Sequence, residues 1–263
     1  MFDLLFASPA ITSKFILIWK RNFVNFRKTI FVSLVWILIE PVIFLGGLGY
    51  GLGYFVSQIH GQAFVQFLFP GILCFTAMLV SFFEATYGTY HKLSYQKTFQ
   101  TILIAPVSAY EIVLGEILWS ASKGFLGVCG VLFVGGTMGL VDSINFVYCL
   151  APLALLCWTF ASLGMLVTSW ARNYDSFIYA SSGFITPMSM IAGVYFPVDQ
   201  LPWGMQQFSH LLPLSWGTLS VRWILDDKPG HFIYLIPPLC AMILTSYVAQ
   251  NLAMKRIQKK LIY

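Results

Sequence analysis

The chain has 263 residues, of which 58% are hydrophobic, 17% aromatic and only 10% charged, and its formal net charge at pH 7 is +5. Soluble domains carry roughly 25% charged residues, and the mean hydropathy of +0.78 implies more apolar surface than one globular core of this length can bury. This composition excludes an ordinary soluble enzyme and predicts a protein embedded in the lipid bilayer. At about 20 residues per spanning helix, six spans would use about half of the chain and leave no room for a second catalytic domain.

The first predicted element is an interfacial helix over 8–28. Ser8 and Pro9 are typical of a helix start, because a side-chain acceptor precedes a residue whose missing N–H costs nothing at the first helical position. Apolar residues recur behind them at helical spacing with cations between them, so we expect this helix to lie on the cytoplasmic membrane surface. No cationic segment precedes the first hydrophobic stretch, and we therefore expect no cleaved signal peptide.

Six apolar segments are predicted to span the membrane, and with them the chain forms one all-α polytopic transmembrane domain over 1–263. The first contains Pro41, where we expect a kink. Its glycines also recur four residues apart, a spacing that allows two helices to approach closely. These glycine pairs are Gly47 with Gly51 and Gly49 with Gly53. The predicted spans are 29–54, 63–88, 109–139, 144–169, 176–196 and 232–253.

Two further helical segments are predicted between the spans. Residues 97–105 form an amphipathic helix that ends before Pro106, and its apolar face needs a partner or the membrane to cover it. Ser108 and Glu111 then form a capping-box pattern that begins the third span. Residues 197–230 contain several prolines but are too apolar for a free loop, so we predict two short helices that dip into the outer leaflet as a re-entrant hairpin.

The distribution of cations predicts the topology, because cytoplasmic segments hold the excess of Lys and Arg. Six spans place both termini in the cytoplasm, and outside they leave only Arg222 and Lys228, with Lys123 inside the membrane. This bias indicates a multi-pass membrane protein and explains the positive charge better than nucleic-acid binding does. The predicted inside cations are Lys14, Lys20, Arg21, Arg27, Lys28, Lys92, Lys97, Arg172, Lys255, Arg256, Lys259 and Lys260.

Motifs for enzyme chemistry are absent from the sequence. The four histidines stand singly, so no two-histidine metal site can form on one helix. No G-x-S-x-G pattern and no Gly-Lys pair occur, which excludes a nucleophile elbow and a Walker phosphate loop. The five cysteines lie in apolar runs without C-x-x-C spacing, which favours a packing role. We therefore expect no catalytic, cofactor-binding or metal-binding residue on this chain.

Charged residues within the spans are the strongest candidates for function. Glu40, Glu84 and Lys123 each cost about 2.5–3.5 kcal/mol to insert near the bilayer centre, so they must face protein or water. They could line a substrate path, relay protons, or pair with one another and hold the helices in register. Glu116 lies nearer the cytoplasm and could snorkel, and its seven-residue separation from Lys123 is too long for a direct helical pair.

Aromatic residues offer a second possible path lining. Phe75, Phe82 and Phe83 lie on the second span. In a membrane chain with 24 phenylalanines, however, most such side chains face lipid or core.

Four stretches of the sequence resemble a known family. The first span reads IEPVIFLGGLGYGLG, the second begins FLFPGIL, and the following loop reads TFQTILIAPVSAYEIVLGE. From Val167 the chain reads VTSWARNYDSFIYASSGFITPMSMIAGVYFPVDQLP and continues to LLPLSWGTLSVRWIL. These stretches are similar to the membrane subunits of type 2 ABC exporters, and most similar to the permeases of nodulation-factor lipo-oligosaccharide export. The resemblance covers nearly the whole chain.

The resemblance implies a six-span permease that dimerises and docks two separate ATPase subunits, which would bind ATP and Mg²⁺. Residues 97–105 would be the coupling helix that receives the ATPase stroke, and the hairpin would form an outer gate between the protomers. The residues assigned to ATPase coupling are Lys97, Phe99, Ile102 and Leu103. The residues assigned to the outer gate are Phe196, Pro197, Leu201, Pro202, Trp203 and Pro213.

The function that this resemblance implies is export of an amphipathic cargo, such as a lipid-linked glycan or a lipo-oligosaccharide, out across a bacterial inner membrane by alternating access. The predicted partners are a second copy of the chain, two ATPase subunits, membrane lipid and the cargo. A proton-coupled secondary transporter that uses Glu40, Glu84 and Lys123 is the alternative, although the inverted repeat common in that class is not evident. A membrane-embedded transferase is a third hypothesis, which the lack of clustered His or Asp weakens.

Overall fold

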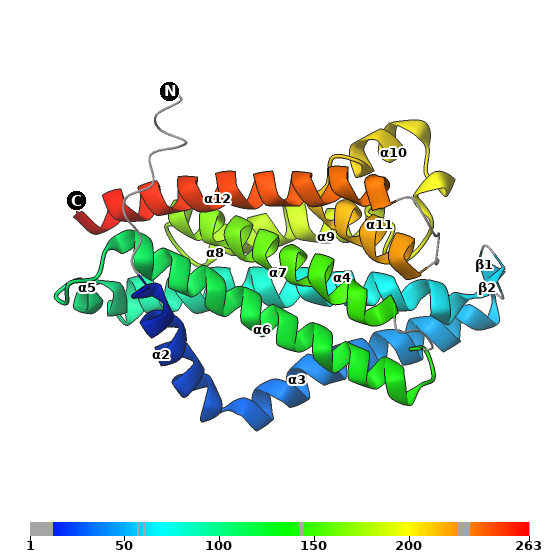
Figure 1. The fold of residues 1–263 in the computed structure, drawn as a ribbon, viewed down its shortest axis with the longest axis horizontal. Helices are drawn as coiled ribbons and strands as arrows, with labels where there is room; N and C mark the ends of the chain where they lie inside the picture. Colours follow the sequence, from blue (N-terminus) through cyan, green and yellow to red (C-terminus); the bar gives the residue numbers. More distant parts are fainter. Residues whose placement is uncertain (1–12, 57, 60, 142–144, 226–231, 263) are drawn as a thin grey trace.

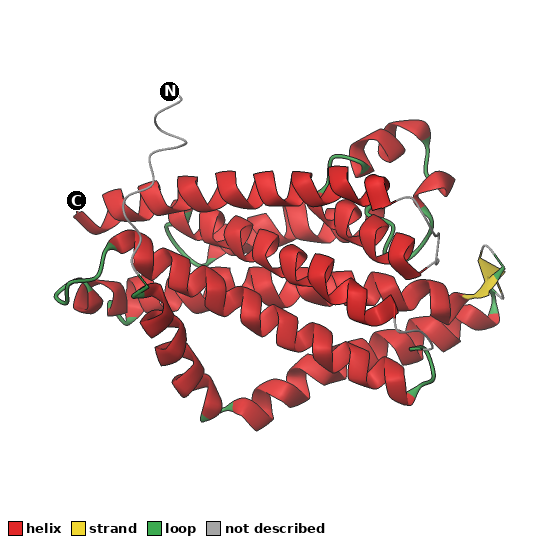
Figure 2. Ribbon diagram, in the orientation of Figure 1, coloured by secondary structure: helices red, strands yellow, loops and turns green. Residues whose placement is uncertain are grey.

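The structure is a computed structural model, and it describes residues 13–56, 58–59, 61–141, 145–225 and 232–262. Long helices lie roughly along one axis, with a short β-hairpin at one end and the chain's C-terminus at the other (Figures 1 and 2). The elements in chain order are α2 (Phe15–Arg27), α3 (Ile30–Ile43), η1 (Phe44–Gly51), η2 (Leu52–Tyr54), β1 (Gln58–Ile59), β2 (Gln62–Ala63), α4 (Phe64–Phe83), η3 (Glu84–Gly88), η4 (His91–Tyr95), α5 (Thr98–Ile102), α6 (Ala109–Thr137), α7 (Asn145–Trp170), α8 (Asp175–Ala180), η5 (Ser181–Ile185), α9 (Thr186–Ile191), η6 (Val198–Gln200), α10 (Trp203–Ser209), α11 (Pro213–Leu225), η7 (Phe232–Leu235) and α12 (Ile236–Ile262).

The core is built around α4, which packs against α6, α7 and α11. Its residues from Phe67 to Met78 are all buried, as expected for a helix that is apolar on every side. Together with the π-helical segments η3 and η4, α4 forms one continuous helix, Phe64–Tyr95. This helix extends beyond the predicted span over 63–88 and carries its polar C-terminal part to the end of the bundle where α5 lies (Figure 1).

Three helices in the described part of the chain are long and apolar enough to cross a membrane. They are Phe64–Tyr95, Ala109–Thr137 and Phe146–Trp170. The chain is therefore an all-α membrane protein, apart from the small antiparallel pair in which Gln58 faces Ala63. The other predicted spans fall on α3 with η1, on α8–η5–α9 and on α12, and their crossing of the membrane stays a prediction.

The amphipathic helix α2 packs on α6 and meets α3 at a sharp bend (Figure 1). Its buried residues, Ile18, Asn22 and Phe26, are four apart and so form one face. Gly115 of α6 permits this contact, because a Cβ atom there would lie 2.6 Å from Ile18 Cβ. Residues 8–12 of the predicted interfacial helix, with Ser8 and Pro9, lie outside the described residues.

The predicted helix over 97–105 is shorter in the structure, where α5 covers Thr98–Ile102. Lys97 has a φ of 50°, and this left-handed conformation separates α5 from η4. After Ile102 the chain continues as tight turns towards Pro106, which disfavours helix in the residue before it. The capping box that begins α6 is confirmed, since Ser108 Oγ accepts from the Glu111 N–H at 3.2 Å and Glu111 Oε2 accepts from the Ser108 N–H at 2.8 Å.

Two predictions about the first span have different outcomes. Gly49 and Gly53 face α4, where a Cβ at Gly49 would lie 2.9 Å from Val65, whereas Gly47 and Gly51 have no neighbour within 4 Å. Within the described part of the chain, only one of the two glycine pairs therefore serves packing. Helix α3 continues through Pro41 as far as Ile43, and the wider π-helix η1 begins three residues after the proline, at Phe44.

The predicted hairpin contains the helices α10 and α11, and its residues 226–230 lie outside the described residues. Arg222 of α11 holds it against the core, because the guanidinium lies 3.8 Å from the centre of the Phe67 ring and donates to the carbonyl oxygens of Phe67 and Val194. At the opposite end of the bundle, Lys260 of α12 donates to the Ala171 carbonyl at 2.8 Å. Burial there lowers the pKa of the Lys260 ammonium below its usual value.

Candidate functional site

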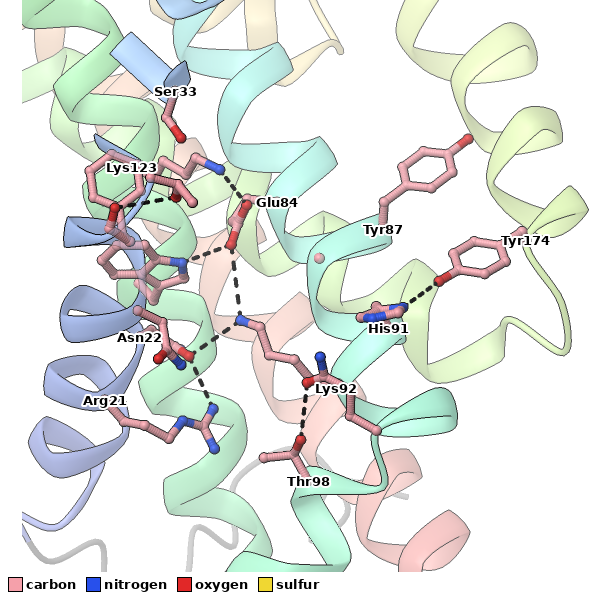
Figure 3. A pocket seen from close by; sticks show the side chains of 16 residues that line it. Arg21, Asn22, Ser33, Glu84, Tyr87, His91, Lys92, Thr98, Lys123 and Tyr174 are labelled. Carbon is pink, nitrogen blue, oxygen red and sulfur yellow. Dashed lines mark hydrogen bonds and ion pairs between the residues drawn. The ribbon is translucent and has the colours of Figure 1, made fainter. Parts of the chain in front are cut away.

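Charged side chains from three helices meet near the α5 end of the bundle, and we call them the charge cluster (Figure 3). α2 contributes one cation, the long helix Phe64–Tyr95 contributes a carboxylate and a cation, and α6 contributes one of each. The members of the charge cluster are Arg21, Glu84, Lys92, Glu116 and Lys123.

Glu84 is held by donors from α6. Lys123 Nζ lies 2.7 Å from Glu84 Oε2, and Trp119 Nε1 donates to Glu84 Oε1 at 2.7 Å. Lys92 Nζ is 3.9 Å from the same Oε1 atom. Of the three roles considered for the intramembrane charges, Glu84 and Lys123 therefore show pairing in this structure. The pair satisfies two groups that would otherwise be costly in the bilayer.

Glu116 is fully buried and binds two cations. Arg21 Nη2 donates to Glu116 Oε1 at 2.7 Å, and Lys92 Nζ donates to Glu116 Oε2 at 2.7 Å. The prediction that Glu116 could snorkel is wrong, because its carboxylate points into the protein. By binding Arg21 and Lys92, this carboxylate of α6 links α6 to α2 and to η4. Glu116 and Lys123 bind different partners, as their seven-residue separation predicted.

The charge cluster is not neutral, and some of its donors are unused. Its three cations exceed its two carboxylates by one charge. Asn22 Oδ1 accepts from Arg21 Nη2 at 3.0 Å and from Lys92 Nζ at 3.4 Å. By contrast, Asn22 Nδ2 and Arg21 Nη1 are buried and have no hydrogen-bond partner in the part of the chain that the structure describes.

A cavity of about 890 Å³ lies beside the charge cluster, and we call it the polar cavity. One wall comes from α2 and the start of α3, including Asn25 and Ser33, and the other from the helix Phe64–Tyr95. His91 Nδ1 and the Tyr174 hydroxyl lie 3.1 Å apart at its side (Figure 3). Charged, amide, hydroxyl and aromatic groups thus surround one space, which can accept a polar group from an amphipathic molecule.

Glu40 is not part of the charge cluster. It lies on the exposed side of α3, and among the described residues it takes part in no ion pair. Glu40, Glu84 and Lys123 therefore do not form the continuous chain that a proton relay through all three would need in this conformation.

The residues assigned to ATPase coupling do not share one exposed surface. Phe99 is fully buried, and Ile102 and Leu103 pack half-buried against the core. The apolar face of α5 is therefore covered by the chain itself, contrary to the expectation that a partner or the membrane covers it. Lys97 is exposed, and Ile104, just beyond the helix, is 87% exposed.

The residues assigned to the outer gate and the path are also divided between surface and core. Phe75 and Phe82 are buried, and Phe83 is at the surface beside Tyr87, so only Phe83 is placed to face a path in this conformation. Among the gate residues, Pro197 and Pro213 are buried, Phe196 and Leu201 half-buried, and Pro202 and Trp203 exposed. Pro197 borders a second cavity of about 830 Å³ between the hairpin and α4.

Several functional candidates are missing from the sequence-based site. Arg21 and Lys92 are interpreted there only as orienting cations, Trp119 only as an aromatic residue that could line a path, and Asn22 has no assigned role. Helical spacing places Asn22 on the buried face of α2 between Ile18 and Phe26, which is the one signal that could have found it. Among the described residues, no group of His, Cys, Asp or Glu could hold a metal ion.

Long apolar helices that enclose ion pairs and a polar cavity are features of a membrane transport protein. A family model described as ABC-2 type transporter matches residues 13–225, and the chain belongs to this family. It is similar to nodulation protein J of Sinorhizobium fredii (strain NBRC 101917 / NGR234), with 36% identity over 251 residues that cover 95% of this chain and 96% of that protein.

Two other relatives extend this comparison. Nodulation protein J of Rhizobium meliloti (strain 1021) is 35% identical over 95% of this chain and 96% of its own length. The inner membrane transport permease YadH of Escherichia coli (strain K12) is 22% identical over 78% of this chain and 80% of its own length. No solved structure matches the chain. The family and these relatives identify a membrane-spanning permease subunit of an ABC transporter.

Proposed function

We propose that two copies of this chain and two ATPase subunits form an exporter that moves an amphipathic cargo across a bacterial inner membrane. The observation that carries this proposal is the similarity to nodulation protein J along 95% of the chain. A lipo-oligosaccharide or a lipid-linked glycan is the proposed cargo, since the polar cavity offers groups for a hydrophilic head and the exposed helices offer apolar surface for a tail.

In the proposed topology the chain crosses the membrane six times and has both termini in the cytoplasm. The cations at the α5 end support this orientation, because Lys and Arg accumulate in cytoplasmic segments. We call residues 97–104, in which Lys97 and Ile104 are exposed, the α5 turn. In this topology the α5 turn faces the cytoplasm, and the hairpin with α10 and α11 lies at the outer face.

The proposed mechanism is alternating access driven by the ATPase subunits. In this mechanism ATP and Mg²⁺ bind to the ATPase subunits and not to this chain. Closure of the ATPase subunits pushes on the α5 turn, and the continuous helix Phe64–Tyr95 transmits this movement towards the hairpin. The charge cluster joins α2, α6 and this helix, so that they move as a unit when the path between the protomers changes its opening.

A purification from native membranes tests the proposal. The tagged chain is extracted in a mild detergent, the complex is weighed by native mass spectrometry, and ATP hydrolysis is measured. We expect two copies of the chain with two copies of a protein that carries a Walker phosphate loop. A chain that repeatedly purifies alone and without ATPase activity would contradict the proposal and favour ion-coupled transport.

A further inference from the structure

Two residues that line the polar cavity, Arg21 and Asn22, carry donors that no described group accepts. These donors, Arg21 Nη1 and Asn22 Nδ2, are buried and have no hydrogen-bond partner among the described residues. Asn22 is only 4% exposed. Its orientation is set by its side-chain oxygen, which accepts from Arg21 and Lys92, and the amide nitrogen therefore stays free to donate. Buried donors of this kind are normally satisfied by a protein group, water or a ligand.

The charge around these donors selects the sign of the ligand. Both carboxylates of the charge cluster are already bound, Glu116 by Arg21 and Lys92, and Glu84 by Lys123 and Trp119. Within the charge cluster, the three cations exceed the two carboxylates by one positive charge. An arginine fork next to amide donors in a partly desolvated site suits a phosphate group, whose oxygens accept several charge-assisted hydrogen bonds.

The two helices that form one wall of the cavity also expose apolar side chains. Phe23 of α2 and Phe31 and Val32 of α3 are 41%, 83% and 63% exposed, and they lie close in sequence to the lining residues Phe26 and Thr29. A ligand that places an anionic head in the cavity can therefore lay an acyl chain along the bend between α2 and α3.

We propose that the polar cavity binds the phosphate group of an anionic amphiphile, with Arg21 Nη1 and Asn22 Nδ2 donating to its oxygens. Two sources share this chemistry, an acidic phospholipid of the membrane and a phosphate-bearing cargo. The assignment to the cytoplasmic leaflet rests on the proposed topology, but the binding does not.

A binding experiment on the purified full chain in maltoside micelles tests this site, and it needs neither an ATPase subunit nor transport. Native mass spectrometry and thermal unfolding are followed while dioctanoyl phosphatidic acid, dioctanoylglycerol or inorganic phosphate is added. We expect phosphatidic acid to bind at least about tenfold more tightly than dioctanoylglycerol, which has the same chains without the phosphate. It should also bind more tightly than inorganic phosphate, which has no chains.

Asn22→Asp is the decisive variant, because it keeps the acceptor oxygen for Arg21 and Lys92 and replaces the free donor with a negative oxygen. We expect at least about a tenfold loss of phosphatidic acid binding with an unchanged or higher melting temperature. Asn25→Asp adds the same charge at an exposed residue of the cavity wall and should weaken binding less, which keeps the test valid if Asn22→Asp does not fold. Gln207→Asp, exposed on α10, is the charge-matched control and should bind normally.

Two outcomes would overturn the proposal. They are equal binding of phosphatidic acid and dioctanoylglycerol, and wild-type binding by both cavity variants. Equal binding of inorganic phosphate and phosphatidic acid would overturn the amphiphile assignment. The two sources are distinguished by the lipids that co-purify with the wild-type chain but not with the Asn22→Asp variant. An acidic phospholipid and a glycan-bearing phosphate differ in mass, so mass spectrometry identifies which one is bound. Finding either lipid supports the site.

Discussion

Lys123 and Glu84 link α6 to the end of α4 through an ion pair of 2.7 Å, although they are 39 residues apart in the sequence. Their side chains are 23% and 15% exposed, so the pair is neither a solvated surface contact nor a fully buried one. Because it borders the polar cavity, it contributes both to the packing of two helices and to the wall of the candidate site.

We expect Lys123→Met to lower the free energy of unfolding by about 1–3 kcal/mol, less than the loss of a fully buried pair, because it leaves the Glu84 carboxylate without its closest cation. The double variant Glu84→Gln/Lys123→Met should lose less than the sum of the two single variants. Unfolding by SDS in mixed micelles measures these differences, with Lys20→Met, at an exposed position of α2, as the control. Additive losses would show that the two side chains are not energetically coupled.

Gly115 should be required for the docking of α2. Gly115→Ala places a Cβ 2.6 Å from Ile18 Cβ and 2.7 Å from the Phe15 carbonyl oxygen, so α2 must shift, at a cost of about 1–3 kcal/mol. Hydrogen exchange should show loss of protection in the α2 amides. Gly136→Ala on the same helix meets nothing within 4 Å and should be neutral or stabilise the protein by up to about 1 kcal/mol. Unchanged protection of α2 in Gly115→Ala would mean that this contact is looser than the structure indicates.

The α5 turn should separate folding from ATPase coupling. Ile104 is 87% exposed, so Ile104→Asp should change the free energy of unfolding by less than about 0.5 kcal/mol. If the proposed exporter is correct, the same variant should retain about tenfold less ATPase subunit on purification, because a charge replaces an apolar contact at the interface. Normal retention would place the coupling surface elsewhere on the chain.

Phe99 serves as the contrasting position in that experiment. It is fully buried, and Phe99→Ala should cost about 3–5 kcal/mol of stability through loss of packing and formation of a cavity. Any loss of ATPase binding in this variant should therefore accompany a lower melting temperature. Phe99→Ala with wild-type stability would contradict the buried position of this ring.

Arg222 should anchor the hairpin to the core. Arg222→Lys keeps the charge but loses the planar stack on Phe67 and the fork that reaches the Phe67 and Val194 carbonyls, and we expect a loss of about 1–2 kcal/mol. Arg256→Lys is the matched control, since its guanidinium is exposed and lies 5.0 Å from the Trp170 ring. Thermal unfolding in micelles compares them, and equal stability of the two variants would argue against this anchor.

Composition and local pattern were sufficient for several features of this protein. The low content of charge and the long apolar runs require a bilayer as solvent, and the stretch from Val167 onward indicates the family. The helix start at Ser108 also depends on residues only three apart, so its capping box could be predicted directly. These properties arise from summed hydrophobicity and from neighbours along the chain, which a sequence displays without any knowledge of the packing.

The charge cluster depends instead on which helices become neighbours. Arg21 meets Glu116 across 95 residues, and spacing within a single helix carries no information about such a partner. For the same reason, the amphipathic pattern at 97–105 correctly indicated an apolar face, but only the packing of α5 showed that Phe99 points into its own chain. Contacts between distant helices are selected by complementary shape and charge over the whole bundle, and they alone close the polar cavity around Arg21 and Asn22.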